Sequence, residues 1–192
     1  MRLGVISDIH SNAGALDAAL RALDGRVEQI WCAGDVVVQY RFSNEAVKRL
    51  RDTGAITVQG NHDMVLVSSA GADARRRADV DEDAVAWLAA LPLEHRVEVD
   101  GCRVLMVHGS PWPPHGDYLR AGNAQWRHAD ELGADIVIVG HTHEPMVETF
   151  GATLVVNPGS IGEPRQRVDR AATYAIVDTS ARTATIERLT AT

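Results

Sequence analysis

Apolar runs and amphipathic segments alternate along the first part of the chain. Residues 2–7 form a continuous apolar run, which is typical of a strand buried on both faces. After Ser11 and Asn12, residue types that cap helices, apolar side chains recur at helical spacing as far as Gly25. A further strand, helix and strand are predicted at residues 29–32, 43–52 and 55–59. This βαβαβ order predicts parallel strands joined by right-handed crossovers.

Paired strands dominate the second half of the pattern. A helix over residues 79–91, with acidic residues in its first turn, precedes this change. Asp100-Gly101, a strong hairpin signal, lies between apolar runs at 96–99 and 103–107. A helix, a strand and two strand pairs follow, at residues 123–132, 136–139, 146–150 with 154–156, and 173–178 with 183–189. Because no linker or repeat divides the chain, we predict one α/β domain over residues 1–192 with mixed sheets.

Composition and charge narrow the possible functions. The chain carries 19 Lys and Arg against 26 Asp and Glu, a formal charge of −7 that disfavours binding along a nucleic-acid backbone. No run approaches the roughly 18 apolar residues that span a bilayer, and the apolar amino terminus is predicted to be a buried strand rather than a secretory signal. We therefore expect a cytoplasmic protein without membrane or long nucleic-acid partners. Cys32 and Cys102, each in an apolar run, are predicted to be buried, reduced thiols.

Short polar clusters follow five of the predicted strands. These clusters are Asp8-Ile9-His10, Gly34-Asp35, Gly60-Asn61-His62-Asp63, His108-Gly109 and Gly140-His141-Thr142-His143. The end of a strand is rigid and opens onto a loop, and open α/β sheets bind ligands there. Glycines beside the clusters permit tight turns and close backbone approach. The recurrence predicts a functional site built from strand ends.

The side chains in these clusters are metal ligands by type. Imidazole and carboxylate donors suit Mn, Fe, Zn and Ni, and the lack of thiolates argues against a structural zinc site. The potential donors are Asp8, His10, Asp35, Asn61, His108, His141 and His143. These seven exceed what one catalytic ion needs but fit two ions that share a carboxylate, which leaves His62 to move protons. A lone histidine after a strand is more often a core residue, and Asn61 is also a turn residue type, so the whole set carries the prediction.

Together with Asn157-Pro158-Gly159-Ser160, the polar clusters resemble the motifs of calcineurin-like metallophosphoesterases, in particular the small single-domain phosphodiesterases. The resemblance covers nearly the whole chain. It implies an α/β (α+β) fold, a four-layer αββα sandwich of two mixed β-sheets with helices outside. It also implies a set of ligands for two ions: Asp8, His10 and His143 for the first, Asn61, His108 and His141 for the second, and Asp35 as the bridge.

The expected cofactors are two divalent metal ions, with Mn²⁺ preferred and Fe, Zn, Ni or Co as alternatives. A pair of ions about 3.5–4 Å apart lowers the pKa of a bridging water, so we expect the resulting hydroxide to attack phosphorus in line. By similarity to the family, His62 then protonates the leaving-group oxygen or binds the equatorial oxygens. Asp63 is expected to orient an imidazole, although an Asp at this point is equally typical of a helix start.

Two further residues are predicted to contact the substrate. Arg165 ends a segment that resembles the closing loop of these phosphodiesterases, where it either binds phosphate or is a solvated charge. Trp112 follows the His108 loop, where it either stacks on a base at the mouth of the site or packs in the core. The histidines that match no motif are expected at the surface: His95, His115 and His128.

We expect a phosphodiesterase that hydrolyses small or nucleotide-like phosphate esters. A phosphomonoesterase or a dinucleoside-polyphosphate hydrolase is an alternative, because these specificities share the motifs. A non-catalytic protein-binding scaffold is another, although such a chain would be expected to lose donors. Two divalent ions against the carboxylates of Asp8 and Asp35 leave the site locally positive, so an acidic protein still binds a small phosphate ester. Residues 36–43 border the predicted site and depart from the Gly/Pro-rich loop of related chains, which leaves the choice of substrate open. The sequence also leaves open whether the protein forms a homo-oligomer.

Overall fold

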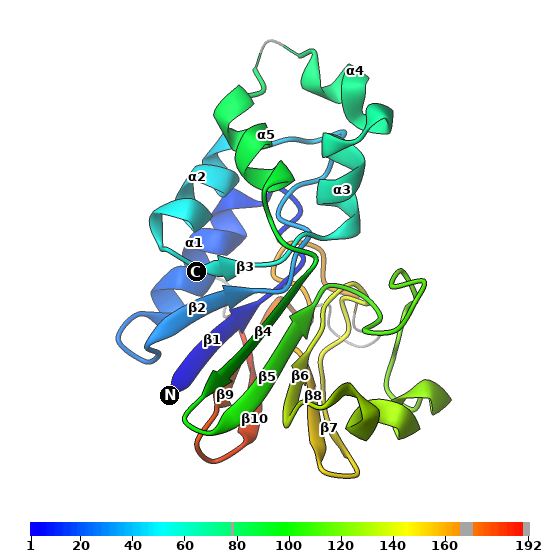
Figure 1. Ribbon diagram of the computed structural model, residues 1–192. Helices are drawn as coiled ribbons and strands as arrows, with labels where there is room; N and C mark the ends of the chain where they lie inside the picture. Colours follow the sequence, from blue (N-terminus) through cyan, green and yellow to red (C-terminus); the bar gives the residue numbers. More distant parts are fainter. Residues whose placement is uncertain (78, 166–170, 190–192) are drawn as a thin grey trace.

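Two five-stranded sheets form the centre of the molecule. The computed structural model describes residues 1–77, 79–165 and 171–189 (Figure 1). One sheet has the strand order β10-β9-β1-β2-β3 and the other the order β4-β5-β6-β8-β7. The last two strands of the chain therefore return to the sheet that the first three began.

β1 (Arg2–Ile6) lies at the centre of the first sheet. All its residues after Arg2 are buried, as the continuous apolar run predicts. It runs parallel to β2 (Gln29–Cys32), and β2 runs parallel to β3 (Ile56–Thr57), which confirms the predicted parallel pairing. β9 (Thr173–Asp178) pairs antiparallel with β1, and β10 (Thr183–Arg188) pairs antiparallel with β9.

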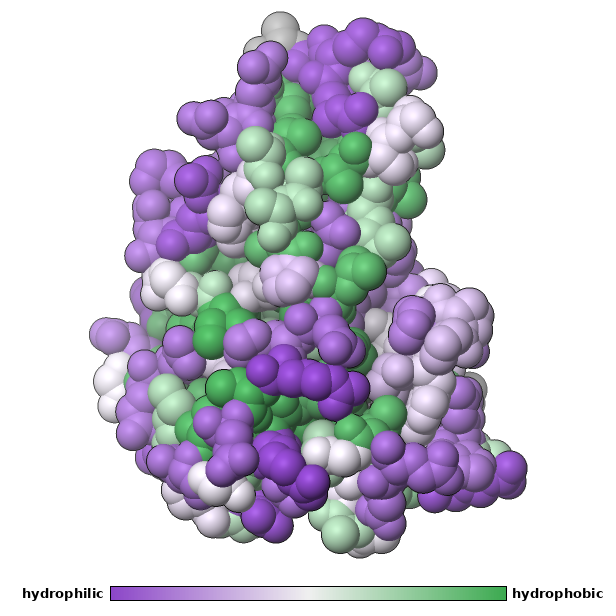
Figure 2. Space-filling view, in the orientation of Figure 1, coloured by the Kyte–Doolittle hydropathy of each residue, from purple (hydrophilic) through white to green (hydrophobic). Residues whose placement is uncertain are grey.

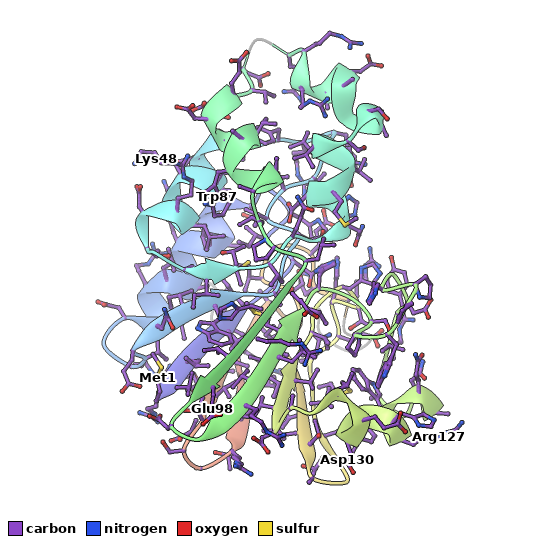
Figure 3. All side chains as sticks on the ribbon, in the orientation of Figure 1. Met1, Lys48, Trp87, Glu98, Arg127 and Asp130 are labelled. Atoms are coloured by element: carbon purple, nitrogen blue, oxygen red, sulfur yellow. The ribbon has the colours of Figure 1, made fainter. Side chains whose placement is uncertain are left out.

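Helices cover the outer face of the first sheet. α1 (Ala13–Leu23) begins after Asn12, whose side chain accepts a hydrogen bond from the Ala15 backbone nitrogen at 3.0 Å. α5 (Glu82–Ala89) lies beside α2 (Asn44–Asp52), and Trp87 of α5 lies on the side that faces α2 (Figure 3). The Arg51 guanidinium is 6.0 Å from the centre of the Trp87 ring. Between α2 and α5 the chain forms shorter helices: α3 (Asn61–Val67), η1 (Ser69–Gly71) and α4 (Ala72–Arg75).

The second sheet begins with the predicted hairpin. β4 (Glu94–Val99) and β5 (Cys102–Val107) pair antiparallel across the Asp100-Gly101 turn. β6 (Ile136–Ile138) lies parallel to both β5 and β8 (Thr153–Asn157), and β7 (Met146–Phe150) forms the edge opposite β4. The 3₁₀ helix η2 (Ala124–Leu132) covers the outer face of this sheet.

Three apolar clusters hold the layers together. The middle cluster joins residues of the first sheet, such as Leu3 and Val5, to residues of the second, such as Met106. The two outer clusters pack Leu16 of α1 and Trp126 of η2 against the outer faces. The predicted four-layer αββα sandwich is confirmed. Cys32 and Cys102 are buried and free, as predicted, and none of the described helices has the length and apolar character needed to cross a bilayer.

Several predicted elements need correction. The helix expected from Asp79 begins at Glu82, because the Asp81 side chain accepts from the Asp83 backbone nitrogen at 2.8 Å and caps it. The strand expected over 55–59 is limited to Ile56–Thr57, and the helix at 123–132 is a 3₁₀ helix. α3 was not predicted as an element, although Asp63 was interpreted alternatively as a residue typical of a helix start.

His95, expected at the surface, is half-buried on β4. Its ring lies edge-on to the Trp31 ring of the middle cluster, with centroids 5.2 Å apart. The indole and the surrounding strands desolvate the imidazole, which lowers its pKa. His95 was expected at the surface because it belongs to no motif, but the absence of a motif does not determine whether a side chain is exposed.

Arg103 and Asp135 connect β5 to the start of β6. The Asp135 carboxylate accepts hydrogen bonds from the Arg103 backbone nitrogen at 2.8 Å, from Nε at 3.1 Å and from Nη2 at 3.0 Å. These bonds lower the pKa of Asp135 from 3.8 to about 2. A carboxylate whose pKa is lowered on folding stabilises the protein above its unfolded pKa, and that contribution is lost as the pH falls through the folded value.

We expect Asp135→Asn to lower the free energy of unfolding by about 1–2 kcal/mol at neutral pH, because hydrogen bonds to a charged acceptor are weakened. The difference from the wild type should narrow as the pH falls from about 4 to about 2, where both proteins lack the charge. Urea unfolding at a series of pH values measures this difference in the free energy of unfolding. Asp52→Asn, in the exposed Lys48–Asp52 pair, is the matched control and should change stability by less than about 0.5 kcal/mol. An equal loss at every pH would show that the carboxylate charge is not responsible.

Candidate metal centre

The five polar clusters meet where the parallel strands end. β1, β2 and β3 end on one side of the site, and β5 and β6 end on the other (Figure 1). Backbone hydrogen bonds join the loops that follow: the Asp8 nitrogen donates to the Gly34 oxygen at 3.0 Å, and the Gly140 nitrogen donates to the His108 oxygen at 2.8 Å. Residues distant in sequence therefore face one another in a small, buried region.

The predicted ligands themselves adopt left-handed backbone conformations. Five of the seven have positive φ angles between 49° and 66°: Asp8, His10, Asp35, His141 and His143. Asp and His tolerate this region better than most residues, and such conformations concentrate at functional sites. The neighbouring glycines have both predicted roles. Gly34 also has a positive φ, of 93°, and Gly60 permits close approach, because a Cβ there would overlap the Asp35 backbone.

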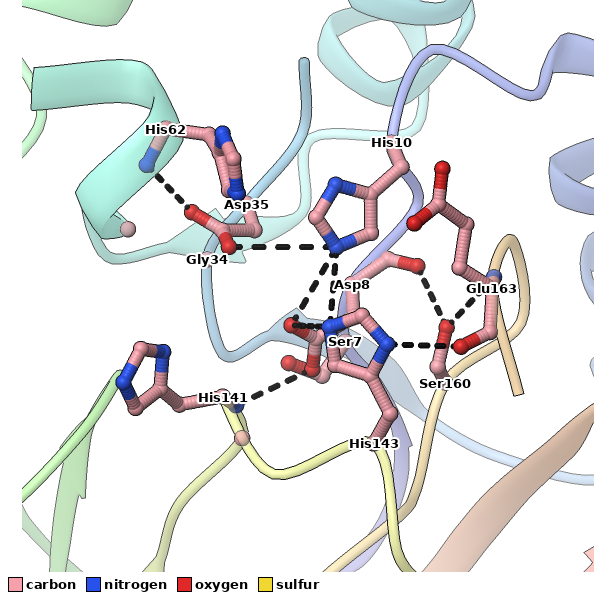
Figure 4. A network of polar contacts seen from close by, with 12 residues as sticks. Ser7, Asp8, His10, Gly34, Asp35, His62, His141, His143, Ser160 and Glu163 are labelled. Atoms are coloured by element: carbon pink, nitrogen blue, oxygen red, sulfur yellow. Dashed lines mark hydrogen bonds and ion pairs between the residues drawn. The ribbon is translucent and has the colours of Figure 1, made fainter. Parts of the chain in front are cut away.

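Three side chains converge as a first donor group, shown in Figure 4. His143 Nε2 lies 3.0 Å from His10 Nε2 and 3.2 Å from Asp8 Oδ1. His10 Nε2 and Asp8 Oδ1 are 3.6 Å apart. Donors about 2.1 Å from a shared ion have similar separations. Asp8 Oδ1 is buried and has no hydrogen-bond partner among the described residues. A buried, unpartnered carboxylate oxygen facing two imidazoles fits a bound cation.

A second donor group lies next to the first. Asp35, His108 and His141 have potential ligand atoms within 4.8 Å of one another, and Asn61 Oδ1 is 3.0 Å from His108 Nε2. Asp35 Oδ2 is 3.2 Å from His108 Nε2 and 3.8 Å from His10 Nε2 of the first group. Asp35 thus lies between the two groups, where the sequence analysis expected a bridging carboxylate.

The electrostatics of the site favour positive charge. Burial opposes a charge on His108, but the carboxylates of Asp35 and Asp8 raise its pKa to about 10. Burial, followed by the charge of His108, lowers the pKa of His141 to about 4. The buried carboxylates thus hold a proton on one imidazole, and divalent cations would supply the same compensation.

Backbone carbonyl oxygens orient three of the imidazoles. His108 Nδ1 donates to Ala33 at 2.7 Å, His143 Nδ1 to Glu163 at 2.6 Å, and His141 Nε2 to Gly116 at 3.1 Å. Because a carbonyl only accepts, each bond places a proton on the bonded nitrogen, so the opposite nitrogen is the one that would bind a metal. On His108 a metal would take the place of the second proton, which the neighbouring carboxylates favour.

Asp63 contacts backbone amides, which corrects the expectation that it orients an imidazole. Its carboxylate accepts from the Gly60 nitrogen at 2.9 Å, the Val37 nitrogen at 3.0 Å and the Val36 nitrogen at 3.2 Å. Burial, followed by the nearby Asp35 charge, raises its pKa to about 7. Asp63 caps α3, as the alternative interpretation suggested, and ties that helix to the Asp35 loop.

His62 lies at the edge of both donor groups. Its backbone nitrogen donates to Asp35 Oδ1 at 2.8 Å, and its ring centroid is 5.1 Å from that of His10. His62 Nδ1 is 2.9 Å from Gln39 Oε1, an acceptor, so Nδ1 carries a proton and Nε2 is left for other partners. Burial is the main cause that lowers the pKa of His62.

The segment 36–43 borders the site, as expected, and supplies two residues that the sequence analysis did not single out. Gln39 binds His62, and Arg41 donates to the His10 carbonyl oxygen at 3.0 Å and to Glu163 Oε1 at 2.7 Å. Their position after Gly34-Asp35 was the available signal. No motif of this segment pointed to either contact.

Comparison with known proteins identifies the family. The model of the calcineurin-like phosphoesterase superfamily domain matches residues 1–182. The chain belongs to this superfamily. A relative named "Probable metallophosphoesterase" in Methanothermobacter thermautotrophicus is 30% identical over 169 residues, which are 86% of this chain and 80% of the relative. "Uncharacterized protein MJ0912" of Methanocaldococcus jannaschii is 29% identical over 92% of this chain and 82% of its own.

A solved structure supports the assignment. The crystal structure of a metallophosphoesterase from Sphaerobacter thermophilus matches with a TM-score of 0.79 at 28% identity, over 99% of this chain and 89% of that chain. The expected resemblance is thereby confirmed. The protein is a metal-dependent phosphoesterase.

The Asn157–Ser160 motif of this phosphoesterase supports the ligand loops. Asn157 Nδ2 donates to the Gly140 oxygen at 2.7 Å and to Thr142 Oγ1 at 3.1 Å. Ser160 Oγ donates to the Asp8 oxygen at 2.8 Å. Both side chains are buried, so the motif holds the loops of both sheets rather than contacting a substrate.

The two predicted substrate contacts have different outcomes. Trp112 of the phosphoesterase packs edge-on against Trp126, with ring centroids 5.6 Å apart, on the outer face of the second sheet. The packing interpretation therefore replaces base stacking. Tyr118 stacks on His141 of the metal centre instead, with ring centroids 3.9 Å apart. Arg165 is exposed, and its backbone nitrogen donates to the His143 oxygen at 3.4 Å, so a phosphate contact stays a prediction.

His115 and His128, the other two histidines that match no motif, lie in different places relative to the site. His128 pairs with Glu131 at 2.7 Å, away from the site. His115 is exposed, as expected, but it lines a cavity that opens beside Asn61, His108 and His141.

Proposed function

We propose that this phosphoesterase is a phosphodiesterase that uses two divalent metal ions to hydrolyse small or nucleotide-like phosphodiesters. The position of Asp35 carries the proposal. Its Oδ2 atom lies 3.8 Å from His10 Nε2 of one donor group and 3.2 Å from His108 Nε2 of the other. A carboxylate between two sets of donors suits the bridging of two ions.

The donors divide between the two ions as the resemblance implies. The first ion would be held by Asp8, His10 and His143, the second by Asn61, His108 and His141, and Asp35 would contact both. When bound, such ions polarise the phosphoryl group and supply an activated water. Nitrogen and oxygen donors without thiolate suit Mn²⁺, the metal we propose, with Fe, Zn, Ni and Co as alternatives.

We assign His62 the transfer of a proton to the leaving-group oxygen. Gln39 accepts from Nδ1 at 2.9 Å, which orients the ring and leaves Nε2 for the substrate. The imidazole is half-buried, and one of its nitrogens lies within 4.8 Å of ligand atoms of His10 and Asp35, at the edge of the metal centre. A proton donor at the edge of the metal centre, close to a departing alkoxide, is suited to general-acid catalysis.

Names of relatives support two related specificities. "Phosphodiesterase MJ0936" of Methanocaldococcus jannaschii is 26% identical over 83% of both chains. A symmetrical bis(5'-nucleosyl)-tetraphosphatase of Aromatoleum aromaticum is 34% identical, but over only 38% of this chain. The first match extends across both sheets, and we therefore favour diester hydrolysis, with dinucleoside-polyphosphate hydrolysis as the second candidate.

Hydrolysis of a substrate panel tests this function. We expect Mn²⁺-loaded protein to hydrolyse bis(p-nitrophenyl) phosphate with a kcat/KM at least about tenfold above that for p-nitrophenyl phosphate and for diadenosine tetraphosphate. EDTA should abolish the activity and added Mn²⁺ should restore it. A preference for the tetraphosphate would support the second candidate instead. If the metal-loaded protein hydrolyses none of the three esters, the proposal is wrong.

Other sequence expectations stay predictions. These are a cytoplasmic location, which we predict, and the oligomeric state, which the sequence leaves open between a monomer and a homo-oligomer. Size-exclusion chromatography with light scattering measures the second.

A further inference from the structure

A cavity of about 480 Å³ opens directly beside the second donor group. Asn61, His108 and His141 form one side of it. Its other walls come from α3, from the start of β4 and from the loop after β5, and Figure 2 shows apolar surface below α3 on this face. Ligand pockets of small molecules commonly measure about 300–1,000 Å³, so the space suits a substituent of a bound phosphate ester.

The walls away from the metal centre are apolar. Met64 and Leu93 line the cavity although they are 44% and 60% exposed, and Val107 and Pro114 add further apolar surface. Large apolar side chains exposed around a concave surface mark ligand or partner sites more often than scattered ones do. The cavity is therefore built to remove an apolar group from water.

Polar side chains in the cavity wall are already bonded within the protein. Gln59 Nε2 donates to the Leu88 oxygen at 2.7 Å, and the Ser110 hydroxyl donates to the Trp112 oxygen at 2.9 Å. The Ser110 nitrogen also donates to the His115 oxygen at 3.0 Å, which closes the loop after β5 on itself. These contacts leave few polar atoms to bind a hydrophilic substituent such as a sugar.

The charge of the cavity also excludes a further phosphate. Among the described residues that line it, none is Lys or Arg, and Glu94 contributes a carboxylate. Beyond the donor group, a polyphosphate extending into this space would meet the Glu94 carboxylate and, in the described part of the chain, no Lys or Arg side chain. The cavity thus fits an uncharged aromatic group.

We propose that this cavity is a substrate subsite that binds an aromatic ester substituent, a phenyl or nucleobase-sized ring, of a phosphodiester whose phosphate lies at the metal centre. The subsite rests on the proposed function, because the phosphate must bind beside Asn61, His108 and His141. Met64 and Leu93 are its specificity-determining residues. They contact the organic group and leave the phosphate to the metal centre.

Calorimetric binding of two phosphonates to the Mn²⁺-loaded protein tests the subsite without hydrolysis. Phenylphosphonate and methylphosphonate share the head group and differ only in the organic group. We expect phenylphosphonate to bind at least about tenfold more tightly, because the ring is removed from water. The double variant Met64→Ala/Leu93→Ala should reduce this ratio by at least about threefold and leave methylphosphonate binding unchanged.

Val147→Ala is the matched control, since Val147 is an exposed apolar residue of β7 that does not line the cavity. It should keep the wild-type ratio. Methylphosphonate binding with no advantage for the phenyl compound, or an unchanged ratio in the double variant, would overturn the subsite while the proposed function stands. If neither phosphonate binds to the metal-loaded protein, the proposed function fails and the subsite with it.

Discussion

Asp35→Asn is expected to lower kcat/KM for bis(p-nitrophenyl) phosphate by at least about 10³-fold, because a neutral amide is a poor bridge between two cations. The change keeps the shape of the side chain and one oxygen. That oxygen can still accept from the His62 nitrogen, a bond of 2.8 Å in the wild type. The loss should therefore reflect charge rather than displacement of α3.

Metal content distinguishes this cause from misfolding. Elemental analysis should show two Mn²⁺ ions per wild-type chain and fewer in Asp35→Asn. Circular dichroism in the presence of chelator should be the same for both proteins, since the substituted side chain does not pack in an apolar cluster. Two tightly bound ions and full activity in the variant would rule out the bridging role of Asp35.

His62→Ala is expected to reduce turnover by about 10²–10⁴-fold for esters with poor leaving groups, the range typical of general-acid catalysis. A p-nitrophenolate leaves without much protonation, so hydrolysis of p-nitrophenyl esters should fall far less. Rates for a series of aryl phosphodiesters of rising leaving-group pKa measure the difference as a steeper dependence in the variant. Both metal ions should stay bound, because His62 lies outside the assigned ligand set.

His128→Ala is the control for the loss of an imidazole, because His128 pairs with Glu131 away from the metal centre. It should keep wild-type rates for the whole series. A uniform loss across all leaving groups in His62→Ala would argue for contact with the equatorial oxygens instead. A loss of one metal ion would move His62 into the ligand set.

Elements with a strong apolar pattern could be predicted closely from the sequence. β2 was predicted at its observed bounds, since its short apolar run follows Glu28 and ends close to Gly34-Asp35. α3 was missed because Gly60 precedes it in place of a side chain that caps helices. The cap comes instead from Asp63, three residues later, within a cluster that was interpreted mainly as chemistry.

The predictability of the site follows the same physical division. Asp35, His108 and His141 carry their chemistry in their residue type, and each follows a strand, so a linear pattern indicates them. Gln39 and Leu93 act only through tertiary contacts, the first with His62 and the second at the cavity. Such contacts depend on how segments pack, which no local pattern encodes. Trp112 shows the converse, since this aromatic residue follows a motif but packs against Trp126 of the outer cluster.

The left-handed backbone at the ligands also limits how this site could be transplanted. Asp8, Asp35 and His141 each come after a strand and each have a positive φ angle. This backbone conformation directs their side chains into the site. Placing the same residue types on another scaffold at ordinary strand or helix positions would aim the donors elsewhere. A designer who wished to copy the centre would have to copy five loop conformations and the buried Asn157 and Ser160 that support them. The metal centre therefore depends on the backbone conformation at the strand ends as much as on the identity of the ligands.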